Sequence, residues 1–185
     1  MKKGFTLIEL MVSVAVFSLA LTAALGIFVS SLKVQRYALS SQQISSQSSY
    51  IMEYMSRAAR MARKDVDAIC ISYWDSGELI KLNYKKTRDG QGIKFLNYQD
   101  QCQEFFLEGT RLKENKNGVE NYLTGSDLEV LSFKVGPDSS WDQEDDEQPR
   151  VVLFLEIQGK GQGSGQRPNL KLQTAVSQRN IDIRK

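Results

Sequence analysis

The chain contains no histidine among its 185 residues, and it has only two cysteines and three prolines. Histidine is the commonest general base near neutral pH and the commonest metal ligand, so its absence removes the usual basis of acid–base catalysis and of transition-metal binding. Cys70 and Cys102 lie too far apart in sequence for a CxxC redox or zinc pattern. The composition therefore predicts a protein that is not an enzyme and has no resident cofactor.

Two alternatives stay open for the cysteines. If the domain that carries them lies outside the cytoplasm, an oxidising compartment allows one disulfide between Cys70 and Cys102. Otherwise two reduced, buried thiols are expected, because free cysteine is among the most buried residue types. The cysteine count alone does not decide between these states.

The chain also lacks a strong charge imbalance. It has 24 Lys and Arg residues against 22 Asp and Glu residues, and Lys2 and Lys3 account for the whole excess. A chain without residues 1–4 is formally neutral. A neutral protein has no overall electrostatic attraction to nucleic acid, so we expect no nucleic-acid partner.

One long apolar run dominates the N-terminal part, from Leu10 to Val29. Its only interruptions are Ser13, Ser18, Thr22 and Gly26. Twenty helical residues span about 30 Å, which matches the hydrocarbon thickness of a bilayer. Lysines precede the run and the next one is Lys33, which predicts an N-terminus in the cytoplasm. Glu9 lies at the front of the run, where an unpaired charge is costly and therefore suggests a function.

Two ordinary interpretations fit parts of this segment. A secretory signal needs lysines, an apolar region and a cleavage site, and Ala24–Gly26 is a loose small-x-small site. The apolar run continues past that site to Leu32, however. A plain membrane anchor fits the length of the apolar run and the position of the lysines, but it does not explain Glu9 or the Gly4–Phe5 pair.

The segment Lys2–Leu10, KKGFTLIEL, closely resembles the class III leader of type IV pilins and pseudopilins. The resemblance implies that a prepilin peptidase cleaves between Gly4 and Phe5 and that the new amine of Phe5 is methylated. It also implies that Glu9 pairs with the amine of a neighbouring subunit. The pairing is physically reasonable, because each buried charge removes the desolvation penalty of the other and so fixes the register between helices.

The resemblance implies four parts: a leader at 1–4, a transmembrane assembly helix at 5–32, an amphipathic outer helix at 33–64 and an extracytoplasmic head at 65–185. It also implies a structural subunit of a type IV pilus-like filament, most similar to a minor pilin or pseudopilin. Its partners would be other pilin subunits, a prepilin peptidase and N-methyltransferase, an inner-membrane assembly platform, and membrane lipid before assembly.

Three functions remain open at this stage. Besides a pilus subunit, a pseudopilin of a type II secretion or DNA-uptake system has the same N-terminal pattern. A protein of another class, a membrane-anchored or secreted binding domain with an ordinary signal sequence, is the third. In the first two cases the chain begins as a single-pass protein of the cytoplasmic membrane with its head outside. It then enters an extracellular or periplasmic filament.

The pattern beyond the apolar run predicts an α+β fold. No proline or glycine occurs from Ile27 to Ser76, which favours one helix from about Phe5 to Lys64. Its outer part carries a stripe at heptad spacing that is mostly apolar and includes Ile44, Ile51 and Met55, extended through Ser48. Three segments at 128–135, 151–157 and 170–176 have strand patterns joined by polar loops, which predicts an antiparallel meander packed on the helix. Shorter strands are predicted at 68–74, 79–84, 93–98 and 104–107.

The loop 138–149 is rich in carboxylates, which are hard oxygen ligands that suit calcium. Its candidate ligands are Asp142, Glu144, Asp145 and Asp146. Their spacing lacks the sixth-position glycine of an EF-hand, so the alternative is a charged loop that keeps a sheet edge soluble. Trp74 and Trp141 leave a similar choice between a binding surface and ordinary packing.

Overall fold

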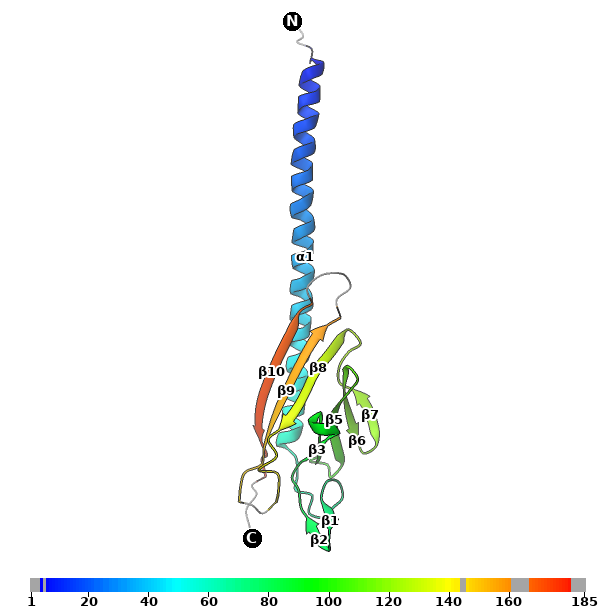
Figure 1. The fold of residues 1–185 in the computed structure, drawn as a ribbon, viewed down its shortest axis with the longest axis vertical. Helices are drawn as coiled ribbons and strands as arrows, with labels where there is room; N and C mark the ends of the chain where they lie inside the picture. Colours follow the sequence, from blue (N-terminus) through cyan, green and yellow to red (C-terminus); the bar gives the residue numbers. More distant parts are fainter. Residues whose placement is uncertain (1–3, 5, 144–145, 161–166, 181–185) are drawn as a thin grey trace. The chain divides into compact units, whose positions relative to one another are not determined.

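The computed structural model describes residues 4, 6–143, 146–160 and 167–180. The chain divides into two compact units, residues 1–39 and residues 40–185, and each is considered by itself. One helix, α1 (Leu7–Arg60), begins in the first unit and ends in the second. All strands in the described residues belong to the second unit, residues 40–185, which is called the head from here on (Figure 1).

The single continuous helix predicted from the sequence is confirmed. Gly26 lies within it, and an added Cβ there would meet no atom within 4 Å. The helix ends at Arg60 rather than at Lys64, because the chain then pairs with a strand: the Arg63 backbone N–H donates to the Leu96 carbonyl at 2.9 Å.

The predicted C-terminal meander is also confirmed. Strands β8, β9 and β10 form a three-stranded antiparallel sheet in the order β10-β9-β8. A bulge between Val130 and Ser132 leaves Leu131 exposed and returns Phe133 to the buried face. The bounds are Leu128–Gly136 for β8, Arg150–Gly159 for β9 and Asn169–Ser177 for β10.

A second antiparallel sheet has five strands in the sequential order β3-β4-β5-β6-β7. The one-turn 3-10 helix η1 (Arg88–Gly90) connects β3 to β4. A separate hairpin, β1 with β2, precedes this sheet. The bounds are Tyr73–Asp75 for β1, Glu78–Ile80 for β2, Lys85–Thr87 for β3, Gly92–Leu96 for β4, Cys102–Glu108 for β5, Arg111–Lys116 for β6 and Val119–Tyr122 for β7.

The core of the head lies between the C-terminal part of α1 and the two larger sheets. The predicted stripe on the helix is buried there, including Ile44, Ser48, Ile51 and Met55. The inward residues of β9, from Val151 to Ile157, are fully buried against it. Burial of this apolar surface supplies most of the stabilisation of the head.

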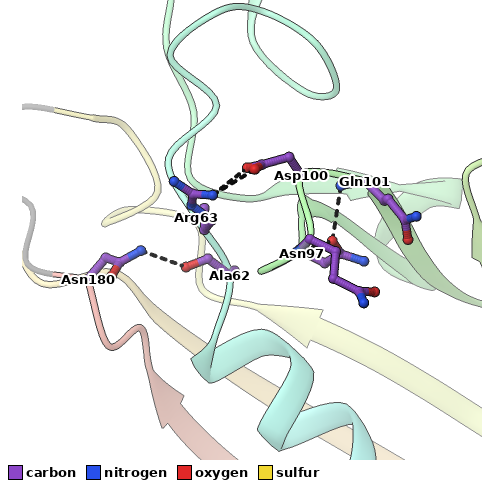
Figure 2. Close-up of polar contacts among 7 residues, drawn as sticks. Ala62, Arg63, Asn97, Asp100, Gln101 and Asn180 are labelled. Atoms are coloured by element: carbon purple, nitrogen blue, oxygen red, sulfur yellow. Dashed lines mark hydrogen bonds and ion pairs between the residues drawn. The ribbon is translucent and has the colours of Figure 1, made fainter.

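Tertiary contacts replace a glycine cap at the end of α1 (Figure 2). The Ala62 carbonyl accepts from the side-chain amides of Gln178, at 2.9 Å, and Asn180, at 3.3 Å. Arg63 donates to both carboxylate oxygens of Asp100 at 2.7 and 2.8 Å. In the last turn of α1 itself, the Ala59 carbonyl accepts from the Tyr84 hydroxyl at 2.7 Å and the Arg60 carbonyl accepts from the Arg179 backbone N–H at 2.8 Å. Donors distant in sequence therefore satisfy carbonyls that a helix end leaves without partners.

Candidate functional site

Thr6 caps the start of α1. Its hydroxyl accepts a hydrogen bond from the Glu9 backbone N–H at 3.4 Å, and its carbonyl accepts from the Leu10 N–H at 3.2 Å. Thr6 and Glu9 thus have the spacing of a capping box, a signal that the sequence interpretation missed. Glu9 lies in the first turn, where the helix dipole favours a negative charge.

The Glu9 carboxylate is exposed and has no hydrogen-bond or ion-pair partner within the part of the chain that the structure describes. Gly4 is exposed and non-helical. Phe5, Lys2 and Lys3 lie outside the described residues. The described geometry therefore leaves a carboxylate available beside the predicted cleavage point.

The first unit presents a long, mostly apolar helical surface. Every residue of α1 from Leu7 to Leu39 is exposed in the isolated chain, and most residues up to Leu32 are apolar. The segment is long and apolar enough to cross a membrane. Exposed apolar surface of this extent is unfavourable in water and compatible with lipid or with neighbouring helices.

The polar side chains within this surface are satisfied by the helix itself. The hydroxyls of Ser13, Ser18 and Thr22 each donate to the carbonyl four residues earlier, at 2.7 to 2.8 Å. An unsatisfied hydroxyl in hydrocarbon costs several kcal/mol, so these bonds make the three residues tolerable in a membrane. The Glu9 carboxylate, by contrast, has no partner among the described residues.

A search of protein families matches residues 1–25 to the prokaryotic N-terminal methylation motif. No curated protein and no solved structure matches the chain. The motif and the apolar helix together define a precursor suited to membrane anchoring. With the long helix and antiparallel sheets of the head, the chain is type IV pilin-like. A leader of this type implies processing by a prepilin peptidase and assembly with other pilins.

A buried carboxylate orders the loop that follows α1. Asp65 is fully buried, and its two oxygens accept four backbone N–H groups. Ile69 donates to Oδ1 at 2.8 Å; Cys70, Ile71 and Ser72 donate to Oδ2 at 3.0, 2.6 and 2.8 Å. Burial alone would raise the pKa of Asp65, but the four donors outweigh it and hold the pKa below its usual value.

This carboxylate replaces the predicted strand at 68–74 with a turn, so that only Tyr73 and Trp74 of that range lie in a strand. Ala68 adopts a left-handed conformation, with φ of 53°, so that the following N–H groups converge on Asp65. No sequence pattern identified Asp65 in advance, because a single aspartate after a helix is a common feature.

Cys70 and Cys102 form a disulfide in the structure. It joins the Asp65 loop to the first residue of β5, and the Arg63–Asp100 ion pair lies close by in sequence. Together with the Arg63–Leu96 backbone bond, the disulfide and the ion pair hold residues 63–70 against β4, β5 and the loop between them.

The acidic loop shows no metal site among the residues described. Asp142 and Asp146 are described, while Glu144 and Asp145 are not. Within the described ranges no three His, Cys, Asp or Glu side chains approach closely enough to hold a metal. The Asp142 backbone instead pairs with Leu82 in an isolated bridge. Calcium binding by the loop remains a prediction.

The two tryptophans differ in their environments. Trp141 is buried, contacts Tyr84 with 5.6 Å between ring centroids, and donates its indole N–H to the Arg150 carbonyl at 2.7 Å. Trp74 lies on the β1–β2 hairpin and is 69% exposed. The sequence alone could not separate these two roles, because the local sequence points the wrong way: Trp141 lies in a polar segment but is buried, whereas Trp74 ends a mostly apolar segment but is exposed.

Proposed function

We propose that this protein is a structural subunit, a minor pilin or pseudopilin, of a type IV pilus-like filament. The observation that carries the proposal is the unpaired Glu9 carboxylate in the first turn of an exposed apolar helix, directly after a methylation-motif leader. Filament assembly gives this carboxylate a partner and gives the apolar surface a cover. Motifs of this kind belong to structural proteins, which supports a structural rather than an enzymatic role.

The proposed pathway begins in the cytoplasmic membrane, with the N-terminus in the cytoplasm and the head outside. A prepilin peptidase cleaves after Gly4, and the new amine of Phe5 is methylated. The amine then pairs with Glu9 of a neighbouring subunit as the helix enters the filament at the inner-membrane assembly platform. A filament in a pilus, in type II secretion or in DNA uptake uses the same steps.

The Glu9 role is tested by the substitution Glu9→Ala in the full chain. We expect normal membrane insertion and leader cleavage, because the apolar run and the cleavage residues are unchanged. Incorporation into sheared filaments, measured by immunoblotting against the membrane fraction, should fall at least tenfold. Ser13→Ala is the matched control, since its hydroxyl bonds only to its own helix. Normal incorporation of the Glu9 variant would contradict the pairing.

A further inference from the structure

The β1–β2 hairpin places two carboxylates directly opposite each other. Its two-residue turn is Ser76–Gly77, with φ of 49° and 91°, and Asp75 pairs with Glu78 in the register. Like charges in directly opposed positions destabilise a hairpin. Within the described residues, neither carboxylate has a cationic partner, and Asp75 accepts only a 3.4 Å bond from the Ser76 hydroxyl. The hairpin tip, residues 74–78, therefore has no counterion among the residues that the structure describes.

A hollow of about 610 Å³ opens elsewhere on the same head, between η1, β3 and β8. Three cationic side chains line it, from Lys86, Arg88 and Lys134, against one acidic side chain, Asp89. We call this site the cationic hollow. No interaction between described residues joins it to the hairpin tip of the same chain.

Two of the three cations are held in position. The Lys86 Nζ lies 3.0 Å from Asp138 Oδ2, and the Arg88 guanidinium lies 3.7 Å from the centroid of the Phe106 ring. Glu104 is 3.7 Å from Arg88, a weak contact for an ion pair. Asp138 and Glu104, together with Asp89, equal the three cations in formal charge. The attraction for an anion therefore depends on Lys134, which is exposed and has no ion-pair partner among the described residues.

The backbone at the hollow is strained. Arg88 and Asp89 both adopt left-handed conformations, with φ of 52° and 53°, and Gly90 follows with φ of 86°. A non-glycine residue in this region is strained, and such outliers gather at ligand-binding sites. The turn therefore holds Arg88 at the hollow in a strained backbone conformation.

We propose that the cationic hollow binds the hairpin tip of a second copy of this chain. The two carboxylates that oppose each other on the tip would approach Lys134, Lys86 and Arg88 of the neighbour. Trp74, on the other face of the hairpin, would contact the walls, where cations favour an indole ring. The tip and the hollow are different surfaces of one chain, so the contact is heterologous and repeats from copy to copy. This contact rests on the proposed function, because it adds a head interaction to a subunit that assembles through its helix.

Charge reversal on each surface tests the contact in the full chain, purified in detergent micelles. Glu78→Lys reverses the tip and also places Lys opposite Asp75, which stabilises the hairpin, so a loss of association cannot arise from its unfolding. Lys134→Glu reverses the hollow. Asp67→Lys is the matched control, an exposed carboxylate outside both surfaces. Sedimentation is measured for each variant, and again with Glu9→Ala to remove pairing by the helix.

Each single reversal should weaken self-association about fivefold, as expected for an exposed ion pair turned into a repulsion, and 0.5 M salt should reduce the difference. An equal mixture of the two single variants should recover most of the association, since each tip then meets a hollow of opposite charge. Failure of the mixture to recover, or an equal loss in the Asp67 control, would overturn the proposal. Binding of free phosphate at the hollow without recovery would assign it to another anion. None of these outcomes alters the Glu9 test.

Discussion

Asp65 provides the most informative perturbation of the head, because its carboxylate is buried and carries four hydrogen bonds. In Asp65→Asn one oxygen becomes an NH₂ group. If the amide oxygen keeps the three donors at the Oδ2 position, the NH₂ group meets the Ile69 N–H, and two donors then face each other. The shape of the side chain is otherwise unchanged.

The loss can be estimated from these bonds. One buried N–H without an acceptor costs about 1–3 kcal/mol, and three charge-assisted bonds that become neutral lose about 1 kcal/mol each. Removal of the buried charge offsets part of this loss of stability, because the desolvation penalty of the carboxylate is no longer incurred. We therefore expect Asp65→Asn to lower the free energy of unfolding by about 3 kcal/mol at pH 7.

The dependence on pH separates this cause from a general packing defect. The pKa of Asp65 is lower in the folded state than its unfolded value, so its contribution is complete above the unfolded pKa of about 3.9 and disappears as the pH falls through the folded pKa. Urea unfolding of the full chain in micelles, followed by tryptophan fluorescence, measures the difference between the natural chain and Asp65→Asn. The difference should shrink below pH 4. Equal stability at pH 7, or a difference independent of pH, would refute the reasoning.

Two further substitutions test the packing around this region. Replacing Cys70 and Cys102 together by serine opens a loop with a sequence separation of 32 residues, which should cost about 3–4 kcal/mol of unfolding free energy. Dithiothreitol should lower the stability of the natural chain by a similar amount and leave the double variant unchanged; no effect of the reductant would contradict the disulfide. Gly92→Ala places a Cβ 2.3 Å from Thr87 Oγ1 and 3.2 Å from the Phe106 Cβ, and should destabilise the head by about 1–3 kcal/mol. Adding Thr87→Ala to Gly92→Ala should recover part of the lost unfolding free energy. Unchanged stability of Gly92→Ala alone would contradict the predicted clash and show that β3 moves aside.

The helix and the meander could be predicted because their patterns are long and simple. Absence of proline and glycine from Ile27 to Ser76 permits one helix, and the stripe through Ile44 and Met55 identifies the buried face. Strand β9 reads as a nearly continuous apolar run because it is the central strand of its sheet. In each case one interaction, burial of apolar surface, determines both the sequence pattern and the structure.

The polar parts of the head could not be predicted in the same way. Strands β6 and β7 have the sequences RLKENK and VENY, which do not alternate between apolar and polar residues. In β6 the charged residue Glu114 takes a buried, inward position, where it accepts from Tyr54 of α1 at 2.7 Å and from Gln103 at 2.5 Å. Strand β7 is exposed and pairs with β6 through the backbone. The Asp65 turn depends likewise on a single side chain. Such structures arise from specific hydrogen bonds between distant residues, and a local pattern does not record them.

At the N-terminus, the sequence identified the motif but not its local structure. The spacing of Gly4, Phe5 and Glu9 led to the methylation motif that the family comparison matches. The capping role of Thr6 and the internal hydrogen bonds of Ser13, Ser18 and Thr22 appeared only in the structure. These bonds depend on side-chain rotamers, which composition and periodicity do not specify.

Mass spectrometry of the mature N-terminus, on protein from cells that carry a prepilin peptidase, tests the central claim most directly. Processing as a type IV pilin-like precursor predicts a chain that begins at Phe5 and carries one methyl group on its amine. A chain that begins at Ile27 would show an ordinary secretory signal, and one that keeps Met1 would show an unprocessed anchor. Either of these two results would contradict the account.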